Sequence, residues 1–176
     1  DAAAPVAMTF DARLDRLAEL AVRVGLNLAP GQELVMTASV EALDLSRRIT
    51  EQAYKAGASL VTTLLSDDRA ALARYRFARD DSFDTAPGWL FDGMAAAFRS
   101  GAARLAVVGD DPSLLANEDP EKVARANRAR SKAYQPALEL IVTSAINWTL
   151  VASATPAWAA TVFPDDAPDV ALAKLW

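Results

Sequence analysis

The chain has 176 residues, of which 52% are apolar and 23% are charged, and its formal net charge is −5. This length and composition are typical of one globular domain, and the acidic balance excludes a nucleic-acid surface, which needs clustered basic residues. The sequence contains no His and no Cys. A His/Cys zinc site, a Ser-His-Asp triad and a cysteine nucleophile are therefore all excluded within it, although carboxylates could still bind magnesium or calcium.

The start of the chain and one uncharged stretch bear on targeting. Residues 1–7 lack the basic start and the apolar run of a signal peptide, and Met8 has the position of a natural start. We therefore expect residues 1–9 to be an N-terminal extension, such as a vector-derived one. Residues 140–163 carry no charge, but an Asn, a Pro and several Ser and Thr residues interrupt them. A strand, a turn and a short helix explain that stretch better than a membrane span, and we expect a cytoplasmic protein.

The first part of the chain alternates helical and strand patterns. Apolar residues recur at helical spacing over residues 10–26, and a Pro-Gly turn then leads into a short apolar strand over residues 33–38. Ser39 is a suitable N-cap for a second helix, and Gly57 is placed to close it. The β-branched run over residues 60–65 predicts the second strand.

The same alternation continues in the middle of the chain. Ser66 or Asp67 can cap a third helix. Apolar residues over 89–98, namely Trp89, Leu90, Met94 and Phe98, indicate a fourth helix, which Gly101 ends. Residues 104–108 predict the third strand. Strands that alternate with helices favour a parallel sheet.

After the third strand, the segment Asp119-Pro120-Glu121 has a capping Asp, a Pro at the first helical position and an acid in the first turn. It predicts a helix that runs to about residue 134. Residues 138–143 and 148–153 are two further strand-like runs. Because the connection between them is too short for a crossover helix, we expect a hairpin or one bent strand over residues 138–153.

These elements predict an α/β fold: a mostly parallel sheet of about five strands, flanked by helices on both faces. No Gly/Ser-rich linker divides the chain, so we expect residues 10–165 to form a single domain. Asp166 and Pro168 open a last helix that is still apolar at Trp176. We expect residues 166–176 to be the start of a helix that continues into further sequence.

Acidic pairs supply the candidate ligand-facing residues. Asp67-Asp68 and Asp110-Asp111 directly follow predicted strands, at the edge where open α/β sheets bind ligands. Neighbouring carboxylates there could hold a hard cation or orient a sugar or an amine. Asp also caps helices and favours turns, which explains the same pairs without a ligand. The candidates are Ser66, Asp67, Asp110, Asp111 and Thr155, and none of them is given a catalytic or metal-binding role.

Two other patterns are weaker. Gly109 could let the backbone approach a ligand, but neither G-x-G-x-x-G nor G-x-x-x-x-G-K-[ST] occurs, so a nucleotide fingerprint is missing. Arg125, Arg128 and Lys132 share one face of a predicted helix and could hold an anion. A solvated helix face is the simpler interpretation of that cluster.

A set of short segments, taken in chain order, resembles the opening of one enzyme family. The segments are Pro30-Gly31-Gln32, residues 53–58, Ser66-Asp67-Asp68, Gly109-Asp110-Asp111-Pro112, residues 129–133, Trp148-Thr149 and residues 155–159. Each is unspecific alone, but the ordered set spans most of the chain. It resembles the N-terminal domain of the thermophilic metalloaminopeptidases, the aminopeptidase T and aminopeptidase S type.

The resemblance implies a two-domain exopeptidase that removes N-terminal amino acids from peptides. It implies two divalent metal ions (zinc, cobalt or magnesium) held by Glu, His, Tyr and Asp residues of a C-terminal catalytic domain, to which residues 166–176 would lead. On this view the present chain holds no catalytic residue and no cofactor and is inactive alone. It would help to enclose the active site and support a homodimer, and its partner would be a peptide substrate.

Two hypotheses from other classes stay open. The first is a free-standing small-molecule-binding α/β module, without catalytic activity, whose ligand lies near Ser66 and Asp110. The second is an interaction domain that uses its Trp-rich C-terminal part, around Trp158, as an oligomer interface.

Overall fold

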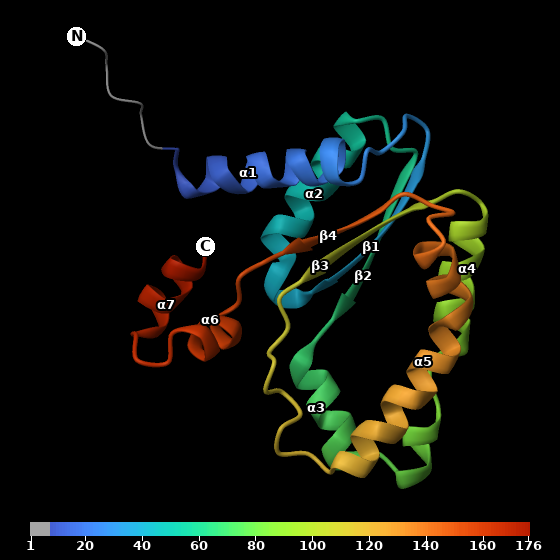
Figure 1. The fold of residues 1–176 in the computed structure, drawn as a ribbon, viewed down its shortest axis with the longest axis vertical. Coiled ribbons are helices and arrows are strands. Elements are labelled where there is room, and N and C mark those ends of the chain that lie inside the picture. Colours follow the sequence, from blue (N-terminus) through green and yellow to red (C-terminus); the bar gives the residue numbers. More distant parts are fainter. Residues whose placement is uncertain (1–7) are drawn as a thin grey trace.

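The strands of the computed structural model, which describes residues 8–176, form one sheet (Figure 1). Its order is β2-β1-β3-β4, and every neighbouring pair is parallel. The strands are β1 (Glu33–Ser39), β2 (Leu60–Ser66), β3 (Ala103–Val108) and β4 (Trp148–Ala152). The helices are α1 (Phe10–Leu20), α2 (Leu43–Lys55), α3 (Asp68–Phe77), α4 (Gly88–Arg99), α5 (Pro120–Val142), α6 (Pro156–Val162) and α7 (Pro168–Leu175).

The strand order contains one reversal, which fixes where a ligand is expected. The chain passes from β1 outward to β2 and, later, from β3 outward to β4 on the opposite side. The reversal therefore lies between β1 and β3, which pair in the register Leu34 to Ala103. In doubly wound sheets, ligands bind outside the carboxyl ends of the strands at such a point.

Two apolar cores cover the two faces of the sheet, as an α/β fold with helices on both faces predicts. On one face, Leu34, Met36 and Leu105 pack with α1 and α2. On the other, Val35 packs with Phe98 of α4 and Ile141 of α5. Successive strand residues alternate between the two cores because side chains of a strand point to opposite faces.

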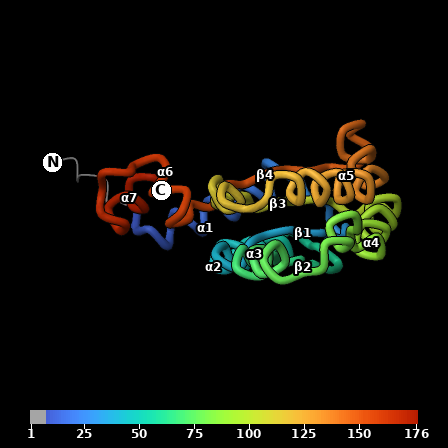
Figure 2. Tube along the Cα trace, turned by 90° about the horizontal axis from the view of Figure 1, so that it is seen from below, coloured from blue at the N-terminus to red at the C-terminus, as the bar shows by residue number. Residues whose placement is uncertain are grey.

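The ends of the molecule carry different pairs of helices. Figure 2 shows α6 and α7 near α1 at one end and α4 with α5 at the other. The rings of Phe10 and Trp176 meet edge to face with their centroids 5.4 Å apart, which joins α1 to the residue that follows α7. Thr9 caps α1 by accepting the Ala12 N–H at 3.2 Å. Of the extension expected over residues 1–9, residues 1–7 lie outside the described part of the chain.

The hairpin or bent strand expected over residues 138–153 is wrong. Helix α5 continues past Pro136 to Val142, and the sheet has four strands where about five were expected. Ala137 and Ile141 are buried one helical turn apart, so the apolar run of the supposed strand is the inner face of the helix. Strand β4 is parallel to β3, and α5 is the crossover between them.

The residues at the ends of α2 and α3 agree only in part with those expected from the sequence. Asp67, and not Ser66, caps α3, since its side chain accepts the N–H groups of Arg69 and Ala70. Ser39 precedes a short 3-10 turn and makes no capping bond with its side chain. Gly57 has a φ of 96°, a left-handed value that glycine adopts at helix ends. Among residues 8–176, no helix is both long and apolar enough to cross a membrane.

Candidate functional site

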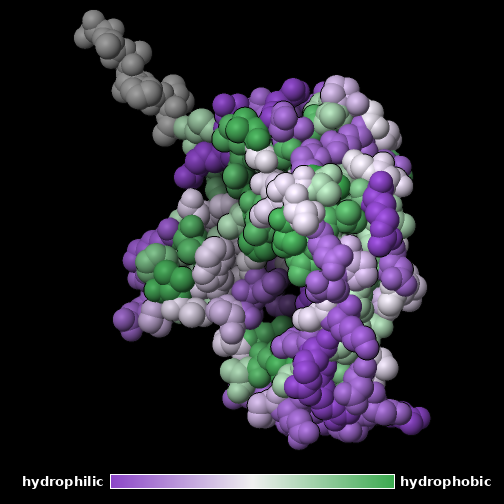
Figure 3. Space-filling model, turned by 45° about the vertical axis from the view of Figure 1, so that its right-hand side comes forward, coloured by the Kyte–Doolittle hydropathy of each residue, from purple (hydrophilic) through white to green (hydrophobic). Residues whose placement is uncertain are grey.

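A cavity of about 800 Å³ opens at the carboxyl edge of the sheet. The ends of β1, β2 and β3 form one side of it, and α3, α4 and α5 form the other. In Figure 3 the surface is hollowed here, with hydrophilic side chains in the hollow and apolar side chains above and below it. The cavity therefore lies at the point of strand reversal where ligands of doubly wound sheets bind.

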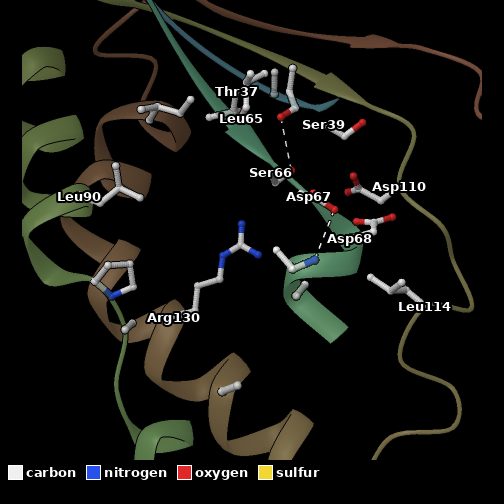
Figure 4. A pocket seen from close by; sticks show the side chains of 18 of the residues that line it. Thr37, Ser39, Leu65, Ser66, Asp67, Asp68, Leu90, Asp110, Leu114 and Arg130 are labelled. Carbon is white, nitrogen blue, oxygen red and sulfur yellow. Dashed lines mark hydrogen bonds between the residues drawn. The ribbon is translucent and has the colours of Figure 1, made fainter. Parts of the chain in front are cut away.

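Four of the five predicted ligand-facing residues line this cavity: Ser66, Asp67, Asp110 and Asp111. Figure 4 shows Ser66 and Asp67 at the end of β2 and Asp110 across from them on the segment that follows β3. Strands that are distant in sequence bring these groups to one edge because the carboxyl ends of parallel strands lie side by side.

Three of those side chains already have local partners. Ser66 Oγ donates to the Ala38 carbonyl at 3.4 Å, and Asp67 Oδ1 accepts the Arg69 N–H at 2.8 Å. Asp111 Oδ1 accepts both the N–H and the hydroxyl of Ser113, each at 2.8 Å. These bonds are the cap and turn chemistry of Asp and Ser. Asp110 is the candidate with no hydrogen bond of this kind within residues 8–176.

Asp68, the partner of Asp67 in its acidic pair, also lines the cavity. Partial burial raises its pKa above the ordinary value of 3.8, and the negative charges of Asp110 and Asp111 raise that pKa further. A hydrogen bond from the Asp111 backbone opposes this shift. No Lys or Arg of the described chain forms a salt bridge with any of the four carboxylates of this edge. The edge is a concentrated negative charge, which favours a cationic group.

Three arginines also line the cavity: Arg74 from α3, Arg104 from β3 and Arg130 from α5. Arg130 extends from α5 into the space, with its guanidinium toward the side of Asp67 and Asp68 (Figure 4). Arg104 lies on β3, and its Nε is buried with no hydrogen-bond partner in the part of the chain described. Arg74 differs, because its Nη2 donates to the carbonyls of Ser82 and Thr85 at 2.7 and 3.1 Å.

Sequence reasoning did not single out Arg104, and it noted Arg130 only as one member of the basic cluster formed by Lys122, Arg125, Arg128, Arg130 and Lys132. Arg104 stands between Ala103 and Leu105, which belong to the α1–α2 core, so strand alternation places it on the cavity face. The alternation of side chains along this strand could therefore have identified Arg104 from the sequence. Arg130 lies in a basic cluster of which Arg125 has a structural role: it pairs with Asp80 at 3.0 Å and also with Asp84.

Thr155, the fifth candidate, lies outside the cavity. Its buried hydroxyl donates to the Gly109 carbonyl at 2.7 Å and accepts the Trp158 N–H at 3.3 Å, which caps α6. A Cβ on Gly109 would lie 2.0 Å from the Ser153 carbonyl oxygen. Glycine is therefore required where β3 passes into the turn that carries Asp110. Thr155 and Gly109 fix the position of that turn.

The chemistry of a dinuclear metal centre does not fit the residues at this edge. Within residues 8–176, no three His, Cys, Asp or Glu side chains converge closely enough to hold a metal ion. Three of the four carboxylates, Asp67, Asp68 and Asp111, already accept hydrogen bonds from the backbone. The site can instead attract a cationic group to its carboxylates and an anionic group to its arginines.

Comparisons with known proteins place this fold in a family. The family model described as thermophilic metalloprotease (M29) matches residues 10–176. Aminopeptidase T of Thermus thermophilus is 50% identical over 95% of this chain, and aminopeptidase AmpS of Bacillus subtilis is 34% identical over 96%. A solved structure of wild-type AmpT from Thermus thermophilus superposes with a TM-score of 0.92 over 96% of the chain.

The match is nearly complete for this chain but partial for its relatives. The chain spans about 41% of the length of aminopeptidase T and of AmpS, and 42% of the solved AmpT chain. On the match over residues 10–176, the chain belongs to the thermophilic metalloprotease (M29) family.

Proposed function

We propose that this chain is the N-terminal domain of a metal-dependent aminopeptidase that hydrolyses N-terminal residues from peptides. The observation that carries the proposal is the 50% identity to aminopeptidase T over 95% of this chain and 41% of that protein. Fold and sequence similarity that extend together over a whole domain support a shared role of that domain, although function depends on the site itself.

The proposed enzyme would hold two divalent metal ions, zinc, cobalt or magnesium, which would supply Lewis-acid chemistry and a water of lowered pKa. A two-metal site needs several converging ligands, and the carboxylates at the carboxyl edge do not provide them. The ligands would come from the part of the family's sequence that this chain does not match.

The contribution of this domain would be to help enclose the active site and to support a homodimer. A cytoplasmic location belongs to the same proposal. Exposed apolar side chains on the outer strand β4, Trp148 at 41% and Leu150 at 53%, are compatible with burial by further protein.

The direct test is an aminopeptidase assay of the purified chain. We expect no release of leucine from a leucyl peptide in the presence of zinc, cobalt or magnesium, whereas aminopeptidase T of Thermus thermophilus serves as the active control. Metal-dependent release that stays with this chain through every purification step would contradict the proposal.

A further inference from the structure

The cavity at the carboxyl edge holds two sets of charges that the chain itself does not neutralise. On one side are Asp67, Asp68, Asp110 and Asp111, of which none pairs with a Lys or Arg in the described structure. Asp67 and Asp111 accept backbone N–H groups, Asp68 accepts one hydrogen bond from the Asp111 backbone, and Asp110 accepts none within residues 8–176, so every one of the four has acceptor capacity left and Asp110 has the most. Each carboxylate oxygen can accept two hydrogen bonds.

Of the three arginines that line the cavity, Arg130 and Arg104 have donors without a partner in the described chain, whereas Arg74 is bonded to two carbonyls. Arg130 forms no salt bridge within residues 8–176, and Figure 4 shows it reaching from α5 toward the acidic side. Arg104 brings a second positive charge to the lining, and its Nε has no hydrogen-bond partner. A guanidinium is a fork of donors that matches a carboxylate. An anion between α5 and β3 would satisfy these donors.

Apolar side chains make up a further part of the lining. Leu64 and Leu65 of β2, Leu90 and Met94 of α4, and Leu114 of the segment after β3 contribute to it. The volume of about 800 Å³ is within the range of small-molecule pockets, which combine apolar walls with a few polar groups. A ligand with an apolar side chain would therefore fit between the two sets of charges.

We propose that this cavity binds a small zwitterion with an apolar side chain, namely an amino acid or a short peptide. Its ammonium group binds Asp68 and Asp110, and its carboxylate binds Arg130. A nucleotide or phosphate is disfavoured because four carboxylates would repel it. A simple cation would leave the arginines unpaired. The proposal rests on the charges of this cavity and does not depend on the proposed function.

The test is a titration of the chain with L-leucine and with L-leucyl-glycine, followed by calorimetry and by amide chemical shifts. N-acetyl-leucine lacks the ammonium group, and leucine amide lacks the carboxylate. We expect at least one zwitterion to bind, and each blocked compound to bind at least tenfold more weakly than the tighter of the two zwitterions. The amide shifts should be largest at residues 66–68, 110–111 and 130. The two zwitterions distinguish an amino-acid site from a peptide site.

Matched variants test whether binding depends on the charges that line the cavity or on the charge of the chain in general. Arg130→Gln and Asp110→Asn should each weaken binding of the zwitterion at least tenfold. The control variants are Lys132→Gln and Asp92→Asn. Lys132 lies on the same helix as Arg130, Asp92 lies on α4, and neither residue lines the cavity. These two controls should bind like the parent chain. Absence of binding at millimolar ligand, equal binding of the blocked compounds, or equal loss in the control variants would each overturn the proposal.

Discussion

Replacement of Gly109 by Ala tests how the turn that carries Asp110 is held. A Cβ at this position would lie 2.0 Å from the Ser153 carbonyl oxygen, whereas real Cβ atoms stay at least 3.0 Å from such atoms. The oxygen belongs to the backbone and the backbone fixes the position of the Cβ, so no side-chain rotation relieves the clash. Separation of the two segments would stretch the bond from the Ser153 N–H to the Val108 carbonyl and the bond from Thr155 to the Gly109 carbonyl, each 2.7 Å long.

The magnitude follows from these terms. Overpacking costs about 1–3 kcal/mol, and each weakened hydrogen bond costs about 0.5–1.5 kcal/mol. We expect Gly109→Ala to lower the free energy of unfolding by about 3 kcal/mol, which lowers the Tm of a chain of this length by roughly 6–12 °C. Urea and thermal unfolding followed by circular dichroism would measure both.

Gly93→Ala is the matched control. Gly93 lies inside α4, and a Cβ there would meet no atom within 4 Å. Because alanine favours a helix interior over glycine, this variant should gain about 0.5–1 kcal/mol. The reasoning is refuted if Gly109→Ala is as stable as the parent chain, or if both variants change stability in the same direction.

Three further substitutions follow from single contacts. Thr155→Val keeps the shape of a buried side chain but leaves the Gly109 carbonyl and the Trp158 N–H at the start of α6 without their partner. The free energy of unfolding in urea should therefore fall by about 1–3 kcal/mol. An unchanged unfolding midpoint would contradict this role of Thr155. Pro136→Ala restores a backbone N–H donor inside α5. It should raise the free energy of unfolding by about 1–2 kcal/mol, because the cost of Pro inside a helix exceeds the stability it gains by restricting the unfolded chain. A lower free energy of unfolding would show instead that the Pro136 ring packs favourably. Asp68→Asn should stabilise the chain at neutral pH. The pKa of Asp68 is raised in the folded chain, so its charged form destabilises the fold above that pKa and has no effect below the unfolded pKa. The gain in Tm should therefore vanish in acid, and a gain that persists at pH 3 would contradict this cause.

Much of the sheet could be predicted because its signals are local. Strand β1 is a short apolar run between a Pro-Gly turn and a helix, and β3 is closed by Gly101 on one side and by the turn after Val108 on the other. Helix α5 could not be predicted to its end. Pro136 normally stops a helix, but here burial of Ala137 and Ile141 against α4 and the sheet offsets the lost hydrogen bond.

The candidate site could be predicted in part for a similar reason. The acidic pairs follow strands directly, so chain order alone places Asp67 and Asp110 at the carboxyl edge. Arg130 comes from the middle of a long helix, and its position over that edge depends on how α5 packs against α4. Thr155 also follows a strand, but its hydroxyl is taken up by the Gly109 carbonyl. No local sequence pattern shows that Asp67 and Asp110 line the cavity whereas Thr155 does not.

The central claim is that this chain is the N-terminal domain of an aminopeptidase. The most direct measurement is the activity of a chimera in which this chain replaces the matched 41% of aminopeptidase T from Thermus thermophilus. We predict a folded chimera that releases N-terminal leucine from a peptide in a metal-dependent way, while the chain alone releases none. A chimera that folds with the Tm and oligomeric mass of aminopeptidase T but has no activity would contradict the claim.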